Sequence, residues 1–378
     1  MVEDKKNLDS GLRRWWASID HVVLSVVVAL ALFGVVLSFS VSPRLSSEKG
    51  VVNFYYVNKH IAYLCIAFFA IFVTSFFDIK WLRRCATIAY IFSFLSLVFL
   101  PWFGTDFGKG AVRWYSLFGY SVQPIEFVKV FFIIFGGWLM SDPTPSVFFK
   151  ISYGVLASFV LLALTCLVLV LQPDYGQAIL LFMVWGIMFF LSGASIIGMC
   201  IIASGGLIFL YVSYIFSPHF AGRIDVFLGS LKGELQHYQT AVAQKAVTHG
   251  GIIGQGPGEG LVKKSLPDAH TDFIFAVAAE EYGFVGGFFI VLLYVLLLLR
   301  VVYRLWFSEK RFICVTGGGL VSLICLQGVI NIGVSLQLLP TKGMTLPFVS
   351  YGGSSLVAAG LVVGALLVVI NRKNTGNF

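Results

Sequence analysis

A short polar segment, Leu266-Pro-Asp-Ala-His-Thr-Asp272, delivers a carboxylate to the start of a long apolar run. Ionisable groups beside hydrocarbon are unfavourable and by default mark a functional site. Asp272 is therefore a candidate general base or electrostatic stabiliser. As a structural alternative, Thr271 and Asp272 cap the helix that begins at Phe273, because a carboxylate there satisfies backbone amides and the helix dipole. Both roles stay open, and both can hold at once.

A second charged pair lies inside an apolar segment. Glu126 and Lys129 are three residues apart, so they share a helix face and can form an ion pair. One interpretation is a structural intramembrane ion pair. The other is a cation that lines a cavity and accepts an anionic group. Gln123-Pro124 fits the entrance of this helix, because a proline is tolerated in the first turn.

Further candidates lie in the connecting segments. In Gly108-Lys-Gly-Ala-Val-Arg-Trp114, Lys109 and Arg113 could hold a phosphate, and Trp114 could sit at the headgroup level as part of an interfacial belt. Asp174 is either a turn residue or a second acidic group of the same cavity. Positive charge that suits a phosphorylated lipid headgroup, with a solvated surface as the alternative, comes from Arg223, Lys263, Lys264 and His270.

The last candidate segment runs from residue 340 to residue 355 and mixes prolines and glycines with hydroxyl side chains. This composition predicts a re-entrant backbone, which is tolerated at membrane depth where it is buried in protein or lines a cavity. Lys342 and Ser350 are its candidate substrate-binding residues. Glu280 and Glu281 lie about two turns beyond Asp272, and one of them is expected to face the bundle interior.

Composition indicates the class of protein that positions these groups. Of the 378 residues, 58% are hydrophobic and 12% are charged, and a soluble domain carries about twice that charged fraction. The net charge of +8 does not indicate nucleic-acid binding, because the sequence contains no aromatic-basic module of the kind that such binding uses. The six cysteines form no CxxC pair and predict neither a disulfide framework nor a metal site.

The apolar segments predict an all-α polytopic membrane protein, with one domain over residues 1–378. A spanning helix needs about 20 apolar residues. Glycines at 283, 286 and 287 are expected to break or bend the eighth segment. About ten segments qualify: 21–40, 60–77, 85–101, 123–140, 151–171, 177–193, 196–216, 273–300, 312–337 and 347–370.

Lys and Arg in the short loops set the orientation. They are more frequent on the side that holds both termini, so residues 1–20 and 371–378 are expected to be cytoplasmic. Residues 217–272 then form a large outer loop between the seventh and eighth spans. Its apolar residues and its glycine-rich stretch 250–260 predict short interfacial helices and re-entrant turns. Asp272 faces outward, which disfavours chemistry that needs ATP.

Five motifs together resemble the SEDS family of bacterial cell-wall polymerases. They span most of the chain in the family's order. The motifs at 267–276 and 338–355 are highly specific. The Thr-Lys-Gly at 341–343 resembles the division members more than the elongation members. The motifs lie at 108–114, 123–129, 172–176, 267–276 and 338–355.

The resemblance implies a ten-helix peptidoglycan glycosyltransferase of septal cell-wall synthesis. It would polymerise lipid II, an undecaprenyl-pyrophosphate-linked disaccharide, at the outer face of the bacterial cytoplasmic membrane. The family's essential aspartate, taken as the catalytic base, maps onto Asp272, and its other motif positions map onto Arg113, Trp114, Glu126 and Lys129. The implied partners are lipid II, a class B penicillin-binding protein and other division proteins. A need for a divalent cation such as Mg²⁺ or Mn²⁺ stays open.

Two other functions stay open. A lipid II flippase is one, because buried charges such as Glu126 and Lys129 also mark transport paths. A noncatalytic division scaffold is the other, and it predicts that Asp272→Ala supports growth. Lipid II in detergent separates the enzyme from the flippase, because polymer formation there needs no transbilayer step.

Overall fold

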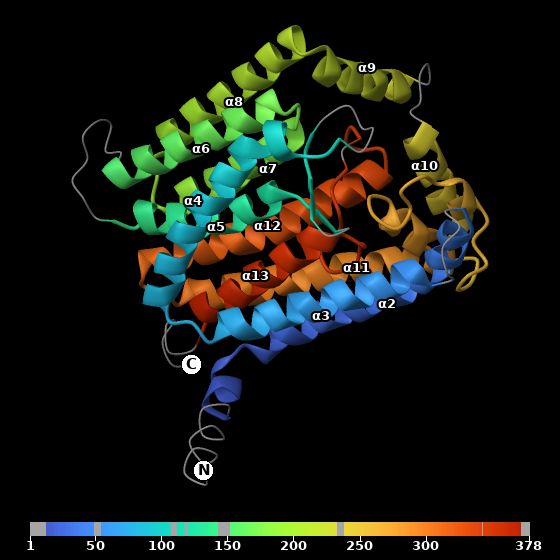
Figure 1. Cartoon of the computed structure of the whole chain (residues 1–378), viewed down its shortest axis with the longest axis horizontal. Coiled ribbons are helices and arrows are strands. Elements are labelled where there is room, and N and C mark those ends of the chain that lie inside the picture. Colours follow the sequence, from blue (N-terminus) through green and yellow to red (C-terminus); the bar gives the residue numbers. More distant parts are fainter. Residues whose placement is uncertain are drawn as a thin grey trace.

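Apolar helices form the body of the molecule (Figure 1). The computed structural model describes residues 13–48, 54–106, 112–117, 120–142, 152–232, 238–341 and 343–371. In this part of the chain a helix coincides with every predicted span. Seven of these helices are long and apolar enough to cross a membrane, and α5, α7 and α13 have 17 residues each. The helices are α2 (His21–Glu48), α3 (Tyr55–Ser75), α4 (Ile79–Phe103), α5 (Pro124–Met140), α6 (Tyr153–Leu171), α7 (Tyr175–Leu191), α8 (Ile196–Phe216), α11 (Ile274–Trp306), α12 (Arg311–Ser335) and α13 (Gly353–Val369).

Small residues let the central helices approach each other closely. A Cβ placed on Gly360 of α13 would lie 2.5 Å from the backbone oxygen of Ala67 in α3, and one on Gly364 would lie 2.7 Å from Cβ of Thr74. Such contacts are typical of helix packing in membranes, where lipid provides no hydrophobic force between helices. By contrast, α8 lies at the edge of the bundle (Figure 1), and most of its side chains are exposed.

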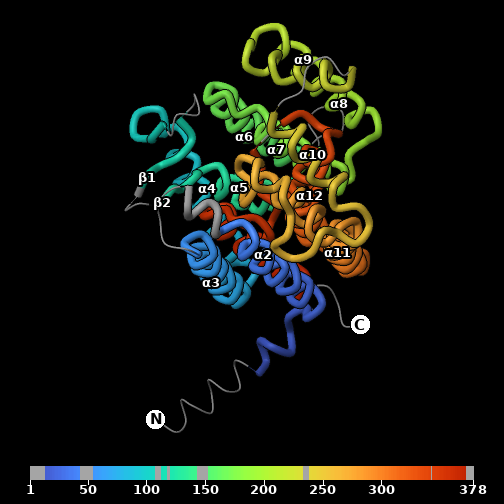
Figure 2. The backbone as a smooth tube through the Cα atoms, turned by 90° about the vertical axis from the view of Figure 1, so that its right-hand side faces the viewer, coloured from blue at the N-terminus to red at the C-terminus, as the bar shows by residue number. Residues whose placement is uncertain are grey.

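The predicted outer loop contains three helices, α9 (Pro218–Lys232), α10 (Tyr238–Gly250) and the 3-10 helix η1 (Val262–Ser265). Figure 2 looks onto this end of the bundle and shows α9 at its upper edge beside α8 and α10 nearer its middle. At the opposite end, Asn371 Nδ2 donates to Ser18 Oγ at 3.2 Å. The two ends of the described chain therefore lie on the same side.

A two-stranded antiparallel hairpin is an addition to the predicted all-α fold. Its strands are β1 (Tyr115–Leu117) and β2 (Tyr120–Val122), and Tyr115 pairs with Val122. A further bridge joins Thr105 to Trp114. The alternation of aromatic or aliphatic residues with serine is typical of a short half-buried strand. The hairpin lies beside α4, at the same end of the bundle as α9 and α10 (Figure 2).

The predicted break in the eighth span is confirmed at Gly283, where φ is 64° and ψ is −159°. The glycine-rich stretch of the outer loop satisfies the backbone groups that the break leaves unpaired. Gln255 N donates to Glu280 O at 2.9 Å, and Phe284 N donates to Gly251 O at 2.9 Å. This loop therefore replaces helical hydrogen bonds around the break, as membrane depth requires.

An ion-pair cluster ties α2 to α11 at the end of the bundle that holds both described chain ends. Asp20 accepts hydrogen bonds from Arg300 Nε at 3.0 Å and from Arg304 Nε at 2.8 Å. Burial alone would raise the pKa of Asp20, but these two arginines and the backbone N–H of Val23 lower the pKa below its ordinary value of 3.8. Asp20 is therefore held as a carboxylate.

Candidate active site

Asp272 lies in a turn just before α11. Its backbone N–H and that of Thr271 both donate to Asp268 O at 3.1 Å. Helix α11 begins at Ile274, so its N-cap residue is Phe273 and not Asp272. No side chain of the described residues caps this helix end. Phe273 O accepts from Ala276 N at 3.0 Å. The predicted capping role of Thr271 and Asp272 is therefore wrong.

The backbone around Asp272 is held at three successive carbonyls. The donors come from α12 and from the predicted re-entrant segment that precedes α13. The bonds run from Tyr351 N to His270 O at 3.0 Å, from Ser350 Oγ to Thr271 O at 2.6 Å, and from Asn331 Nδ2 to Asp272 O at 2.8 Å. This arrangement fixes the stretch that carries the carboxylate, while Asp272 itself is only half-buried.

The Asp272 carboxylate packs against the re-entrant segment. A Cβ placed on Gly343 would lie 2.8 Å from Asp272 Oδ2, so a larger residue there would displace the carboxylate. Ser350 is fully buried, and its hydroxyl also accepts from Leu346 N at 2.8 Å. Its hydrogen bonds shape the segment from inside the protein. The predicted Lys342 lies outside the described residues, as does Lys109.

His270 packs within a group of aromatic side chains beside the Asp272 turn. Its ring centroid lies 5.2 Å from Tyr56 of α3 and 5.6 Å from Tyr351. His60 of α3 lies next to this group, with its ring centroid 6.3 Å from that of Tyr351. These rings connect the turn to α3.

Arginines gather near the turn between α6 and α7, where the ring of Phe220 on α9 lies 5.0 Å from that of Tyr175. Arg113 Nη2 donates to Pro173 O at 2.8 Å, which joins the predicted Arg-Trp motif to the turn that carries Asp174. Burial and repulsion by Arg113 lower the pKa of Arg223 on α9, while Asp174 opposes this change. Burial, Arg223 and Arg113 also lower the pKa of His219. These residues form one basic cluster, with Trp114 next to Arg113 in the chain.

The basic cluster borders the segment that carries Gly343. A narrow crevice between α9 and this segment is lined by Arg223, Gln337, Leu339 and Thr341. Thr341 is two residues from Gly343, against which the Asp272 carboxylate packs. A cationic surface and a half-buried carboxylate therefore share the end of the bundle opposite to the two described chain ends. That combination suits the transfer of a group from an anionic leaving group.

Glu126 and Lys129 form a closed buried network with Gln177 of α7. Lys129 Nζ donates to Glu126 Oε1 at 3.0 Å and to Gln177 Oε1 at 2.8 Å. Gln177 Nε2 donates to the same Glu126 oxygen at 3.1 Å. Lys129 is 0% exposed and Glu126 is 6% exposed. This geometry favours the structural ion pair over a cation that lines a cavity.

Lys263 and Lys264 have different surroundings. Lys263 is buried and forms an ion pair with Glu281, which also accepts from Ser40 Oγ at 2.7 Å. Lys264 is exposed. Glu280 accepts from the backbone N–H of Lys263 at 2.7 Å. Both glutamates are buried in the protein, and they fasten the outer loop to α11.

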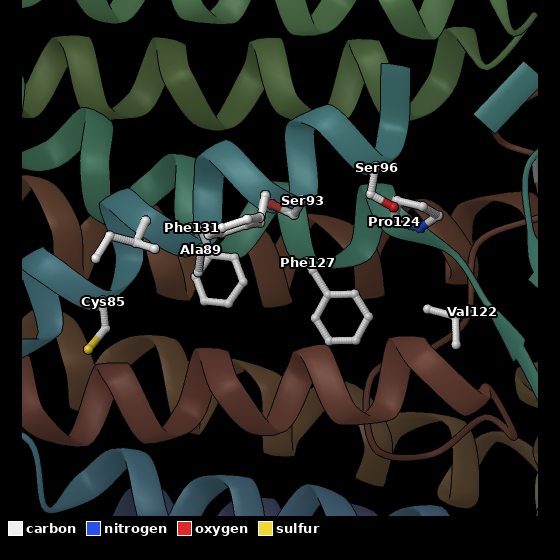
Figure 3. A pocket seen from close by; sticks show the side chains of 10 residues that line it. Cys85, Ala89, Ser93, Ser96, Val122, Pro124, Phe127 and Phe131 are labelled. Carbon is white, nitrogen blue, oxygen red and sulfur yellow. The ribbon is translucent and has the colours of Figure 1, made fainter. Parts of the chain in front are cut away.

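An apolar groove of about 610 Å³ lies between α4 and α5. Figure 3 shows Phe127 and Phe131 of α5 facing it, with Cys85 at one end and Val122 near Pro124 at the other. The end of the groove at Val122 and Pro124 thus lies beside the hairpin and the start of α5. Among the described residues, no group of three or more His, Cys, Asp or Glu side chains could hold a metal ion.

Comparison with known proteins places the chain in a family. Residues 20–375 match the model of the FtsW/RodA/SpoVE family, described as cell cycle proteins. The chain belongs to this family. The predicted membership of the SEDS polymerases is confirmed, since FtsW is a division member of that family and RodA an elongation member.

Curated FtsW relatives cover nearly the whole chain. One from Caulobacter vibrioides, named a probable peptidoglycan glycosyltransferase FtsW, is 32% identical over 365 residues, covering 96% of this chain and 92% of the relative. A relative of the same name from Geobacter metallireducens is 35% identical over 360 residues, covering 93% of this chain and 95% of the relative. The predicted enzyme class agrees with these names.

Solved structures of the family share the fold. The crystal structure of Thermus thermophilus RodA, a rod shape determining protein, matches with a TM-score of 0.68 and 25% identity, covering 96% of this chain and 99% of that chain. A chain from a study of a peptidoglycan synthase complex that coordinates polymerization and crosslinking matches with a TM-score of 0.75 and 24% identity, covering 95% of this chain and 99% of that one. The predicted polytopic helical fold is therefore confirmed.

Two polar residues in this FtsW/RodA/SpoVE chain were missed by sequence reasoning. Asn331 and Gln177 both lie in apolar runs and are at most 3% exposed. An isolated amide in such a run is unfavourable unless it is hydrogen-bonded, and this signal could have identified both. Their partners come from distant segments, which spacing alone does not reveal.

Proposed function

We propose that this chain is a peptidoglycan glycosyltransferase that polymerises lipid II at the outer face of the cytoplasmic membrane during septal cell-wall synthesis. One observation carries the proposal: hydrogen bonds to the backbone carbonyl groups of His270, Thr271 and Asp272 fix the turn that carries the half-buried Asp272 carboxylate. Such rigid support is what a catalytic base requires. The names of the curated relatives support the same enzyme class.

In the proposed reaction, Asp272 removes the proton from the 4-hydroxyl of the acceptor GlcNAc. The resulting oxygen nucleophile attacks the anomeric carbon of the donor, a new glycosidic bond forms, and the bond to pyrophosphate breaks. The undecaprenyl pyrophosphate leaves with the bonding electrons. A positioned general base typically contributes about 10²–10⁴-fold to such a rate.

The basic cluster is suited to the pyrophosphate. Burial and repulsion by Arg113 both lower the pKa of Arg223. A dianionic group between them would relieve this repulsion and stabilise the leaving group. The exposed Lys264 is a further candidate. The substrate-binding roles of Trp114, Asp174, His270, Lys109 and Lys342 stay predictions.

The groove between α4 and α5 suits the isoprenoid tail of the substrate (Figure 3). Its lining is mainly apolar, and its outer end at Val122 and Pro124 adjoins the start of α5. A lipid tail there would leave its headgroup near the basic cluster. Glu126 and Lys129, on the same helix, then act by fixing α5 against α7, a structural part of the site. The flippase alternative loses support, because Lys129 is enclosed by two partners.

We further propose that a class B penicillin-binding protein is the partner and that both termini are cytoplasmic. The contact between Ser18 and Asn371 puts both described chain ends on one side. The excess of Lys and Arg on that side fits the cytoplasm. The motif at 341–343 supports the septal assignment by its likeness to division members.

Incubating the purified chain with lipid II in detergent, with and without the class B synthase, tests the function. We expect glycan polymer, seen as a ladder on gel electrophoresis, because detergent removes any need for transport. Transport of lipid II across proteoliposomes without polymer in either assay would support the flippase and contradict the proposal. Neither product would support the scaffold.

A further inference from the structure

Asn331 joins three separate parts of the site through one nitrogen atom. Its Nδ2 donates to Asp272 O at 2.8 Å and to Met344 O at 2.6 Å. Asn331 itself lies on α12, Asp272 precedes α11, and Met344 belongs to the re-entrant segment. One side chain therefore contacts all three elements.

The chemistry of this link restricts which residue can provide it. Two carbonyl oxygens need two donors, and a short side-chain amide supplies both without a charge. Serine or threonine has one donor, and lysine or arginine would bring an unpaired charge. The other amide atom, Asn331 Oδ1, is buried, and no group of the described residues forms a hydrogen bond with it. Leaving an acceptor unpaired is unfavourable, so fold stability alone does not explain an asparagine here.

The link also controls what lies against the carboxylate. Gly343 precedes Met344, and a Cβ at Gly343 would lie 2.8 Å from Asp272 Oδ2. A shift of Met344 relative to the Asp272 carbonyl would therefore move Gly343 relative to the carboxylate. Asn331 is 1% exposed, which places it behind the carboxylate, inside the protein.

We propose that Asn331 is a positioning residue for glycosyl transfer. By binding the backbone carbonyl oxygens of Asp272 and Met344 together, it keeps the Asp272 carboxylate in a fixed place. This inference rests on the proposed function. Ser350 supports the same turn through Thr271, but Asn331 bonds to Asp272 itself. Small losses of alignment are enough to slow catalysis, since a displacement of about 1 Å can reduce a rate about 10²-fold.

The first test compares Asn331→Ala with wild type in the lipid II polymerase assay. We expect kcat to fall about 30- to 100-fold while KM changes less than about threefold, because substrate contacts are unchanged. Gln327→Leu is the matched control. Gln327 lies one turn earlier on the same face of α12 and is also buried. A wild-type kcat in Asn331→Ala, or an equal loss in Gln327→Leu, would overturn the inference.

The second test uses Asn331→Asp between pH 5 and pH 8. Burial beside two carbonyl oxygens raises the pKa of the introduced carboxyl, and its protonated form can donate one of the two hydrogen bonds. The ratio of its kcat to that of wild type should therefore rise as the pH falls, whereas the ratio for Asn331→Ala stays constant. A constant ratio for Asn331→Asp would overturn the inference, even where Asn331→Ala fails to fold.

Hydrogen exchange gives a readout that does not depend on activity. In Asn331→Ala, amides in peptides covering 268–276 and 343–351 should exchange faster, while those of α3 and α13 keep wild-type rates. Uniform acceleration would indicate general destabilisation and contradict a positioning role. If wild type polymerises lipid II and Asn331 variants behave normally, the inference alone fails. If wild type makes no polymer, the proposed function fails.

Discussion

The buried network of Glu126, Lys129 and Gln177 gives a sharp test of how this site is supported. Lys129 donates to Glu126 at 3.0 Å and to Gln177 at 2.8 Å, and it is 0% exposed. Lys129→Met would leave the Glu126 carboxylate buried without its counter-charge. Removing one member of a buried ion pair typically lowers the free energy of unfolding by about 3–5 kcal/mol. Because both side chains are enclosed, we expect the full effect.

The double variant Lys129→Met/Glu126→Gln removes both charges together. Replacing a buried ion pair by neutral groups of similar volume is often close to neutral, so we expect a loss below about 1.5 kcal/mol. Unfolding of the detergent-solubilised protein, followed by tryptophan fluorescence, gives these values. Polymerase activity of the double variant should return to within about threefold of wild type.

Two results would refute this reasoning. A double variant as unstable as Lys129→Met would show that the charges do not compensate each other. A stable Lys129→Met protein that no longer binds lipid II would show instead that the ammonium meets the substrate. The second result would restore the interpretation of Lys129 as a cavity-lining cation.

Two further predictions concern the ends of the bundle. The lowered pKa of Asp20 contributes stability that is complete above the unfolded-state pKa of about 3.9 and disappears as the pH falls through the lower folded-state pKa. In acid unfolding experiments, Asp20→Asn should therefore not lose this part of its stability below about pH 4. Asp78 is exposed, and the acid unfolding curve of Asp78→Asn should match that of wild type. At the other end, Gly254→Ala should destabilise by more than about 2 kcal/mol, because its φ is +94° and its Cβ would lie 2.1 Å from Glu281 O. Gly258→Ala, with φ of +83° and open space, should cost only about 1–2 kcal/mol in the same unfolding assay, and equal losses would contradict the role of the close contact.

The helices were predictable because hydrocarbon imposes a length and an apolar composition on each span. The break at Gly283 followed from the same logic, since a span of this length needs a place to bend. The loop that fills the break was not predictable in detail: its hydrogen bonds join residues such as Gln255 and Glu280, which are far apart in sequence. The short hairpin at 115–122 was missed because its strands have three residues each.

The candidate site was predictable where charge meets an apolar run. Asp272 and the Glu126–Lys129 pair were found in this way. Sequence could not assign partners, however, so Lys263 was grouped with the substrate-binding cations although it is buried against Glu281. The capping role of Asp272 failed because the turn at Asp268 delays the start of α11 by one residue. Asn331 escaped notice because its partners are carbonyl groups, which every residue has.

The central claim is that Asp272 is the catalytic base, and Asp272→Asn tests it most directly. The amide keeps the size of the side chain and leaves the backbone hydrogen bonds in place, but it does not accept the proton. With purified lipid II and partner synthase, we expect polymer formation to fall about 10²–10⁴-fold, while the variant still binds lipid II and the synthase. Polymer formation by Asp272→Asn at the wild-type rate would contradict the account.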